Sequence, residues 1–113
     1  NLITDYDEIS ILFNQLFENN SFKKEIRDLL IYKKTLLDLN HLNESEILEQ
    51  IKPLLNKDSI WRSQALLLMG DYYFSNKEYL KAKEFYIKIF SIKNLQKDIY
   101  DRAKFQLESI NNE

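Results

Sequence analysis

Apolar residues recur at intervals of three and four along nearly the whole chain, and no stretch alternates with the period of two that strands show. Short polar turns rich in Asn, Ser and Lys interrupt this pattern. Because short connections make successive helices antiparallel, the pattern predicts an all-α fold of helical hairpins. The six predicted helices cover residues 5–18, 22–39, 44–55, 60–74, 78–92 and 96–110.

Several helix boundaries carry sequence signals of their own. Asn43, with Glu46 three positions later, has the form of a capping box, so we expect Asn43 to begin the third helix. Thr4 is the predicted cap of the first helix. Pro53 lies inside the third apolar pattern, where it cannot donate a hydrogen bond to the carbonyl of Glu49. We therefore expect either a kink at Pro53 or a short last turn there.

The composition removes several classes of function. The 113 residues contain no Cys, which excludes disulfides, cysteine-ligated zinc and thiol catalysis. Gly70 is the only glycine, so the chain has no glycine-rich phosphate loop. The formal net charge of −2 indicates neither nucleic acid nor an anionic membrane surface as a partner. We expect no cofactor and no bound metal.

The residues that could do chemistry fit structural roles better. His41 is the only histidine and lies in a polar loop, so we expect it to be solvated rather than a base or a metal ligand. The acidic pairs Glu44/Glu46 and Asp98/Asp101 begin predicted helices, where carboxylates complement the helix dipole. We therefore predict that the chain is not an enzyme.

The predicted helices repeat along the chain. Shifting the second helix by 37 residues aligns its apolar positions with the fourth, and shifting the third by 35 aligns it with the fifth. The aligned pairs are Leu29/Leu66, Tyr32/Met69, Leu36/Tyr73, Ile47/Ala82, Ile51/Tyr86 and Leu54/Ile89. This predicts one domain over 1–113, with the second helix of a partial repeat at 5–19, repeats at 22–56 and 59–93, and a closing helix at 96–110.

A two-helix unit with a period of about 34 residues resembles the tetratricopeptide repeat. The better repeat matches that motif at Gly70, Tyr73, Ala82 and Tyr86. The resemblance implies that the two helices approach most closely at Gly70, where a side chain would hold them apart. It also implies an α-solenoid, in which hairpins stack because none of them buries its apolar face alone.

Some positions depart from the tetratricopeptide motif. Leu66 stands where the motif has Trp, and Asn94 stands where it has Pro. In the earlier repeat, Lys33 falls at the glycine position. We therefore expect the two helices of the earlier repeat to cross less closely.

A narrower resemblance covers about residues 10–110. The run at 54–62 and the segment at 27–29 are similar to the YfgM-like ancillary subunits of the bacterial Sec translocon, and the pair Trp61-Arg62 is the sharpest match. This family implies a single N-terminal membrane span, which this sequence lacks, followed by a periplasmic domain of stacked hairpins. It also implies a role in binding proteins, without catalysis.

Trp61 and Arg62 have two interpretations. In the structural one, the indole fills the junction between hairpins and Arg62 holds the preceding turn at Asp58. In the functional one, the pair forms an exposed hot spot for binding. We favour the structural interpretation.

The tetratricopeptide resemblance implies that the first helix of each repeat lines a concave groove. The groove positions then fall at Arg27, Leu30, Lys34, Leu37, Asp38, Gln64, Leu67, Asp71 and Phe74. We expect Leu30, Leu67 and Phe74 to be exposed and to contact a peptide or helix, unless a neighbouring helix covers them. Leu67 and Asp71 stand where a carboxylate clamp has Lys and Asn, so an acidic C-terminal tail is a poor ligand.

These resemblances imply a module that binds protein or peptide in the groove. The leading placement is the periplasmic side of the inner membrane, in a membrane-tethered adaptor for protein export or chaperone handover; the alternative is a cytosolic adaptor with a dedicated partner. The chain begins at Asn1 rather than Met, so we expect it to be part of a longer protein whose absent N-terminal segment supplies any membrane contact. A homodimer through the first helix is a further hypothesis, because Ile9, Phe13, Leu16 and Phe17 belong to a hairpin whose partner is missing.

Overall fold

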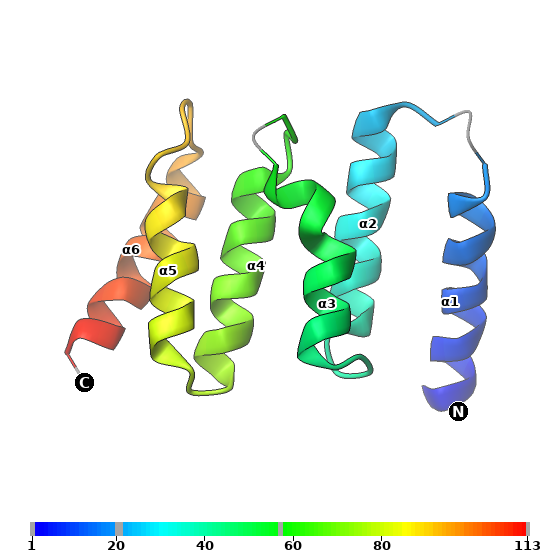
Figure 1. Ribbon diagram of the computed structural model, residues 1–113, viewed down its shortest axis with the longest axis horizontal. Helices are drawn as coiled ribbons and strands as arrows, with labels where there is room; N and C mark the ends of the chain where they lie inside the picture. The colour runs from blue at the N-terminus through cyan, green and yellow to red at the C-terminus, as the bar shows by residue number, and fades with distance from the viewer. Residues whose placement is uncertain (1, 20–21, 57, 113) are drawn as a thin grey trace. The chain divides into compact units, whose positions relative to one another are not determined.

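The computed structural model describes residues 2–19, 22–56 and 58–112, and these ranges contain helices and turns but no strand. They hold six α-helices, as the apolar pattern predicts, and one 3-10 turn, η1 (Figure 1). The elements are α1 (Leu2–Phe17), α2 (Lys24–Asp38), α3 (Glu44–Ile51), η1 (Lys52–Leu55), α4 (Arg62–Ser75), α5 (Tyr79–Ile89) and α6 (Lys97–Asn111). The predicted all-α class is confirmed.

The chain divides into two compact units, Asn1–Trp61 and Arg62–Glu113. Unit 1 holds α1, α2, α3 and η1, and unit 2 holds α4, α5 and α6. Within each unit consecutive helices pack against one another, and in unit 2 α6 also contacts α4. The repeat predicted at 22–56 lies inside unit 1, whereas the one predicted at 59–93 begins in unit 1 and continues in unit 2.

The predicted capping box at the start of α3 is present. Asn43 Oδ1 accepts a hydrogen bond from the Glu46 N–H at 2.9 Å, and the Asn43 N–H donates to Glu46 Oε1 at 3.1 Å. Both bonds satisfy backbone N–H groups that have no partner within the first turn of the helix. The prediction that Thr4 caps the first helix is wrong, because α1 begins at Leu2 and already includes Thr4.

Pro53 produces the predicted short last turn. α3 ends at Ile51, and the chain continues as η1, in which Pro53 is the second residue. A 3-10 turn tolerates proline in its first positions, where the backbone N–H has no helical partner. Leu54 beyond the proline is 0% exposed, so the buried face of α3 continues into η1.

The close approach of α4 and α5 at Gly70 is confirmed. A Cβ atom built at Gly70 would lie 2.7 Å from Cδ1 and 2.9 Å from Cζ of Tyr86. Carbon atoms essentially never approach this closely, so the Tyr86 ring occupies the space that any other residue would need. Ala82, one turn before Tyr86, is also fully buried. Small side chains on both helices therefore let them pack at short range.

The turn between α4 and α5 is a Schellman motif formed without glycine. The Glu78 N–H donates to the Tyr73 carbonyl at 2.9 Å, and the Lys77 N–H donates to the Phe74 carbonyl at 3.0 Å. Lys77 has φ of 61°, in the left-handed region that favours glycine. The turn predicted at 75–77 is thus present, with backbone strain at Lys77.

The departure from the repeat motif at Asn94 has a backbone reason. Asn94 has φ of 56°. Proline fixes φ near −65°, so it cannot adopt this conformation, whereas asparagine tolerates it well. A proline at this position is therefore incompatible with the backbone of this chain.

Burial along α2 suggests a second way to align α2 with α4. The buried Thr35 and Asp38 of α2 fall on the buried Gly70 and Tyr73 of α4 when the offset is 35 residues. The offset of 37 instead places Lys33, which is exposed, on Gly70. The offset of 37 follows the apolar residues of α2, whereas the buried residues of that helix, Asp28, Thr35 and Asp38, are polar. The offset of 35 is also the one that aligns the apolar positions of residues 44–55 with those of residues 78–92.

Candidate functional site

The predicted groove residues lie on one helix of each unit. Arg27, Leu30, Lys34, Leu37 and Asp38 lie on α2, and Gln64, Leu67, Asp71 and Phe74 lie on α4. Two of these side chains are buried, since Asp38 is 0% exposed and Leu67 is 7% exposed. The expectation that Leu67 is exposed is wrong, because α4 is buried on all sides from Ala65 to Gly70.

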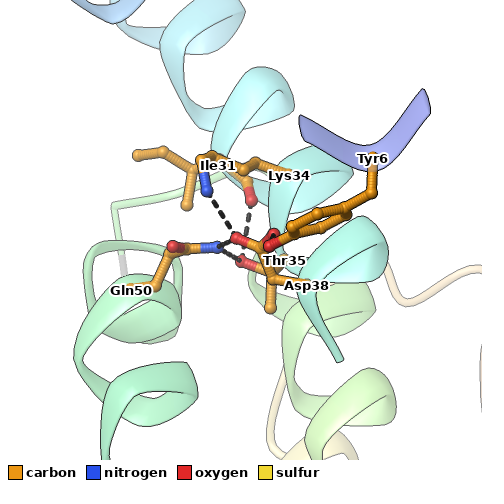
Figure 2. A network of polar contacts seen from close by, with 6 residues as sticks. All are labelled: Tyr6, Ile31, Lys34, Thr35, Asp38 and Gln50. Atoms are coloured by element: carbon orange, nitrogen blue, oxygen red, sulfur yellow. Dashed lines mark hydrogen bonds and ion pairs between the residues drawn. The ribbon is translucent and has the colours of Figure 1, made fainter. Parts of the chain in front are cut away.

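Asp38 is the centre of a polar network inside unit 1 (Figure 2). Its Oδ1 accepts a hydrogen bond from the Tyr6 hydroxyl at 2.6 Å. Its Oδ2 accepts hydrogen bonds from Lys34 Nζ and from Gln50 Nε2, the latter at 3.0 Å. The donors come from α1, α2 and α3, so a single buried carboxylate joins three helices of unit 1.

Thr35 extends this network by one turn. Its hydroxyl accepts a hydrogen bond from Gln50 Nε2 at 3.2 Å and donates to the carbonyl of Ile31 at 2.8 Å (Figure 2). Thr35 is 0% exposed, so these two bonds replace the hydrogen bonds to water that its hydroxyl loses on burial. The contact between α2 and α3 is therefore hydrogen-bonded at its centre.

The charges in this network are fixed at neutral pH. Burial pushes the pKa of Asp38 upward, but hydrogen bonds from Lys34, Tyr6 and Gln50 outweigh it and hold the pKa below its usual value. The hydrogen bond to Asp38, with partial burial and the carboxylate charge, raises the pKa of Tyr6 to about 12. Neither pKa is near the value that a general acid or base needs. The network therefore fits a structural role.

Arg27 fastens the end of α1 to the start of α2. Its guanidinium donates to the carbonyls of Phe17 and Asn19, both at 3.3 Å. The guanidinium also lies over the Phe17 ring, 5.9 Å from its centroid. This predicted groove residue is thus used to hold α1 within unit 1.

Trp61 lies against α2 at the end of unit 1. Its ring stacks on Tyr32 with centroids 5.8 Å apart, and its backbone N–H donates to Ser59 Oγ at 3.2 Å. The Ser59 hydroxyl in turn donates to the buried Asp28 at 2.9 Å. Within the described residues the buried indole Nε1 has no hydrogen-bond partner. This environment supports the structural interpretation of Trp61 over an exposed hot spot.

Asp71 has a comparable place in unit 2. Its Oδ1 accepts hydrogen bonds from the Tyr86 hydroxyl and from Gln106 Nε2, the latter at 3.4 Å, and its Oδ2 accepts from Arg102 at 3.0 Å. Burial, the hydrogen bond from the Tyr86 hydroxyl to Asp71 and the charge of Asp71 raise the pKa of Tyr86 well above its usual value. Asp71 therefore joins α4 to α5 and α6.

A shallow depression lies on α6, beside Asp71. It has a volume of about 370 Å³ and is lined by Asp101, Arg102, Phe105 and Gln106. Phe105 is 68% exposed, and Arg102 and Gln106 are the side chains that hold Asp71. Arg102 and Gln106 therefore line the depression and also bond to Asp71, which is a predicted groove residue.

Seven of the nine predicted groove residues keep accessible surface, and in four of them the side chain is not engaged by a network described above. Phe74 is partly exposed and meets the Tyr79 ring edge-on, with centroids 5.5 Å apart. The amide oxygen of Gln64, also partly exposed, accepts a hydrogen bond from the Ser63 hydroxyl at 2.8 Å. Leu30 and Leu37 are partly exposed as well. A partner can reach these side chains, along with the exposed parts of Arg27, Lys34 and Asp71.

The described residues hold neither a cluster of metal ligands nor a helix that could cross a membrane. They contain no group of three or more His, Cys, Asp or Glu side chains that could hold a metal ion. His41 is exposed and stacks on Tyr6, with ring centroids 3.7 Å apart. In the same part of the chain, every helix is too short or too polar to cross a membrane.

Sequence reasoning missed the partners of both carboxylates. Tyr6 and Gln50 around Asp38, and Arg102 and Gln106 around Asp71, lie 12 to 35 residues away from the carboxylate that they contact. No local spacing links such residues. The offset of 35 was the signal available for Asp38, because it places Asp38 at the buried position of Tyr73.

Comparison with known proteins found no matching family model, no similar curated protein and no similar solved structure. The tetratricopeptide and YfgM-like resemblances therefore stay predictions. A function for the chain has to be argued from the surfaces of its two units.

Proposed function

We propose that this chain is a non-catalytic protein-interaction module whose hairpins stack as a tetratricopeptide-like α-solenoid. In this proposal a partner polypeptide binds the exposed sides of α2 and α4 and the depression on α6. The observation that carries the proposal is the depression beside Asp71, lined by Asp101, Arg102, Phe105 and Gln106.

The depression has the features of a binding hot spot. Phe105 is a large exposed ring that a partner can cover. Arg102 and Gln106 beside it are held by Asp71, so they lose little conformational freedom when a partner binds. An apolar anchor among ordered polar groups suits a polypeptide better than a small substrate, because the depression is open and shallow.

The packing of unit 2 supports the repeat architecture in the proposal. The tetratricopeptide motif requires small residues where its helices meet, and Gly70 and Ala82 are buried against α5 and α4 respectively. A hairpin of this kind buries one face and leaves the other for a neighbour or a partner.

Position-specific photocrosslinking tests the binding surface. A photoreactive residue is placed at Phe105, at Gln64 or, as the control, at Ile87, which is 51% exposed on α5. We expect the first two positions to yield discrete adducts with a polypeptide in cells that produce the full-length protein, and the control to yield none. Equal adducts at all three positions, or none at any, would contradict the proposal.

The cellular placement is a separate part of the proposal. A membrane tether with the hairpins on the periplasmic side follows from the similarity at Trp61-Arg62, and the alternative is a cytosolic adaptor. Fractionation of cells that produce the full-length protein distinguishes them. We expect recovery with the inner membrane and sensitivity to protease added from the periplasmic side. Recovery with the cytosol would contradict the tether while leaving the protein-binding role in place.

A further inference from the structure

The outward side of α1 carries a stripe of exposed apolar residues. Ile9, Leu12 and Leu16 are 40%, 58% and 38% exposed. Their spacing of three and four places them on one face of the helix. Large apolar side chains gathered on one face of a helix are typical of a surface that another chain covers.

The attachment of α1 to the rest of unit 1 uses a different face. Tyr6 bonds to Asp38, and Phe17 receives the guanidinium of Arg27. Phe13 stacks on Phe17, with ring centroids 6.3 Å apart, and both are only partly exposed. Tyr6, Phe13 and Phe17 are spaced by seven and four residues, so they share a face that lies about a quarter turn from the stripe. The stripe therefore stays accessible while α1 is docked.

The stripe lies in an acidic segment. The first 22 residues contain four acidic residues and no Lys or Arg. The acidic residues are Asp5, Asp7, Glu8 and Glu18, and all four are exposed. Asp5 lies one turn before Ile9, and Glu8 lies one turn before Leu12, so carboxylates stand at the end of the stripe.

We infer that this face of α1 is a docking surface for a basic amphipathic helix. The apolar stripe matches the apolar face of such a helix, and the carboxylates attract Lys and Arg residues on its flanks. A second copy of α1 fits less well, because it brings more carboxylates and no cation. This inference goes beyond the proposed function, which places the partner on α2, α4 and α6.

Binding of a designed peptide tests the inference. The probe is a fluorescein-labelled Leu–Lys peptide of about five helical turns, with Leu on one face, and the control is a Leu–Glu peptide with the same Leu positions. We expect saturable anisotropy changes with the Leu–Lys peptide, weakening as salt rises, and at least tenfold weaker binding of the Leu–Glu peptide. Equal binding of the two peptides would overturn the inference.

Matched variants of the whole chain locate the surface. Leu12→Gln should weaken binding of the Leu–Lys peptide about tenfold, because it removes a large part of the apolar contact. The combined change Asp5→Asn and Glu8→Gln should weaken it several-fold and flatten its salt dependence, and it leaves the stripe intact. Ile87→Gln on α5 is the control and should bind as the parent does. Similar affinities in Leu12→Gln and Ile87→Gln would overturn the inference.

Sedimentation of the unlabelled chain separates the competing occupant. A dimer that Leu12→Gln dissociates would assign the stripe to a second copy and overturn the inference. Crosslinking at Phe105 is a separate measurement. Failure of the peptide to bind α1 would therefore leave the proposed function on α6 standing, and failure of crosslinking at Phe105 would leave the inference about α1 standing.

Discussion

Hairpin α2–α3 of unit 1 and hairpin α4–α5 of unit 2 place different chemistry at matching positions. At an offset of 35 residues, Asp38 corresponds to Tyr73 and Gln50 corresponds to Phe85. Gln50 donates a hydrogen bond to Asp38 at 3.0 Å, whereas Tyr73 and Phe85 stack with centroids 5.6 Å apart. At these aligned positions the contact between two helices is polar in one unit and aromatic in the other.

The difference shows what each kind of contact requires. The rings of unit 2 stack directly on each other, so this contact involves only the two helices of the hairpin. The carboxylate of unit 1 needs several donors, and one of them, Tyr6, comes from a third helix, α1. α1 therefore completes the polar contact of unit 1, whereas α6 joins the hairpin of unit 2 at another position, through Asp71.

The largest expected effect comes from removing the carboxylate at the centre of unit 1. Asp38→Ala should lower the free energy of unfolding by about 3 kcal/mol, because it leaves Lys34, whose side chain is 13% exposed, without its counter-charge. Urea unfolding followed by the fluorescence of Trp61, which lies in unit 1, measures the loss. Glu49→Ala on the exposed side of α3 is the control and should change stability by less than about 0.5 kcal/mol. Equal losses of unfolding free energy in the two variants would contradict a central role for Asp38 in the stability of unit 1.

The next effect is steric and belongs to unit 2. Gly70→Ala should lower the free energy of unfolding by about 2 kcal/mol, although alanine favours a helix by about 1 kcal/mol, because the new methyl group meets the Tyr86 ring. Circular dichroism during thermal unfolding measures the change. With the ring replaced in Tyr86→Leu, the same substitution should become neutral or stabilising. A cost of Gly70→Ala that stays the same in both backgrounds would rule out the ring as its cause.

Tyr6→Phe separates the contribution of α1 from that of the hairpin. The lost hydrogen bond to Asp38 should cost about 1 kcal/mol at neutral pH, measured by urea unfolding. Tyr100→Phe on α6 is the control, since Tyr100 is 42% exposed and lies outside unit 1.

The same variant makes a prediction about pH. The folded pKa of Tyr6, about 12, lies above the ordinary value of 10.0, so its stabilisation is complete below pH 10 and is lost as the pH rises toward 12. The difference in the free energy of unfolding between the parent and Tyr6→Phe should therefore become smaller between pH 10 and about 12. On the acid side the pKa of Asp38 lies below its usual value, so its stabilisation is lost as the pH falls below about 4. A difference that stays constant from pH 7 to about 12 would exclude Tyr6 as the titrating group.

The smallest effect concerns the turn of unit 2. Lys77→Gly should raise the free energy of unfolding by about 0.5 to 1 kcal/mol, because glycine adopts a positive φ without strain. Lys83→Gly in the interior of α5 should lower it by about 1 kcal/mol, since glycine disfavours a helix. Thermal unfolding distinguishes the opposite signs, and two changes of the same sign would contradict strain at Lys77.

The sequence predicts most of what depends on local spacing. The six helices, the capping box at Asn43, the short turn after Pro53 and the close approach at Gly70 all follow from periodicity or from one residue's backbone chemistry. These features need only neighbours within a turn or two, or a repeat that the sequence displays.

Features that depend on distant polar contacts were not predicted from the sequence. The groove prediction includes Asp38, yet this side chain is fully buried and accepts hydrogen bonds from α1 and α3. Leu67 was expected to be exposed, yet it is buried. Hydrophobic patterning assigns polar residues to the surface, so it cannot reveal a buried carboxylate whose donors lie elsewhere in the chain.

The contrast between Thr35 and Gly70 has a consequence for how the two hairpins can diverge. At Gly70 the adjoining ring forbids even a methyl group, so every mutation that changes this residue is harmful until Tyr86 changes first. At Thr35 the hairpin relies on hydroxyl bonds, and serine can reproduce them at a single step. A saturation mutagenesis screen of the chain would then record destabilisation by every substitution at Gly70, and tolerance of serine at Thr35.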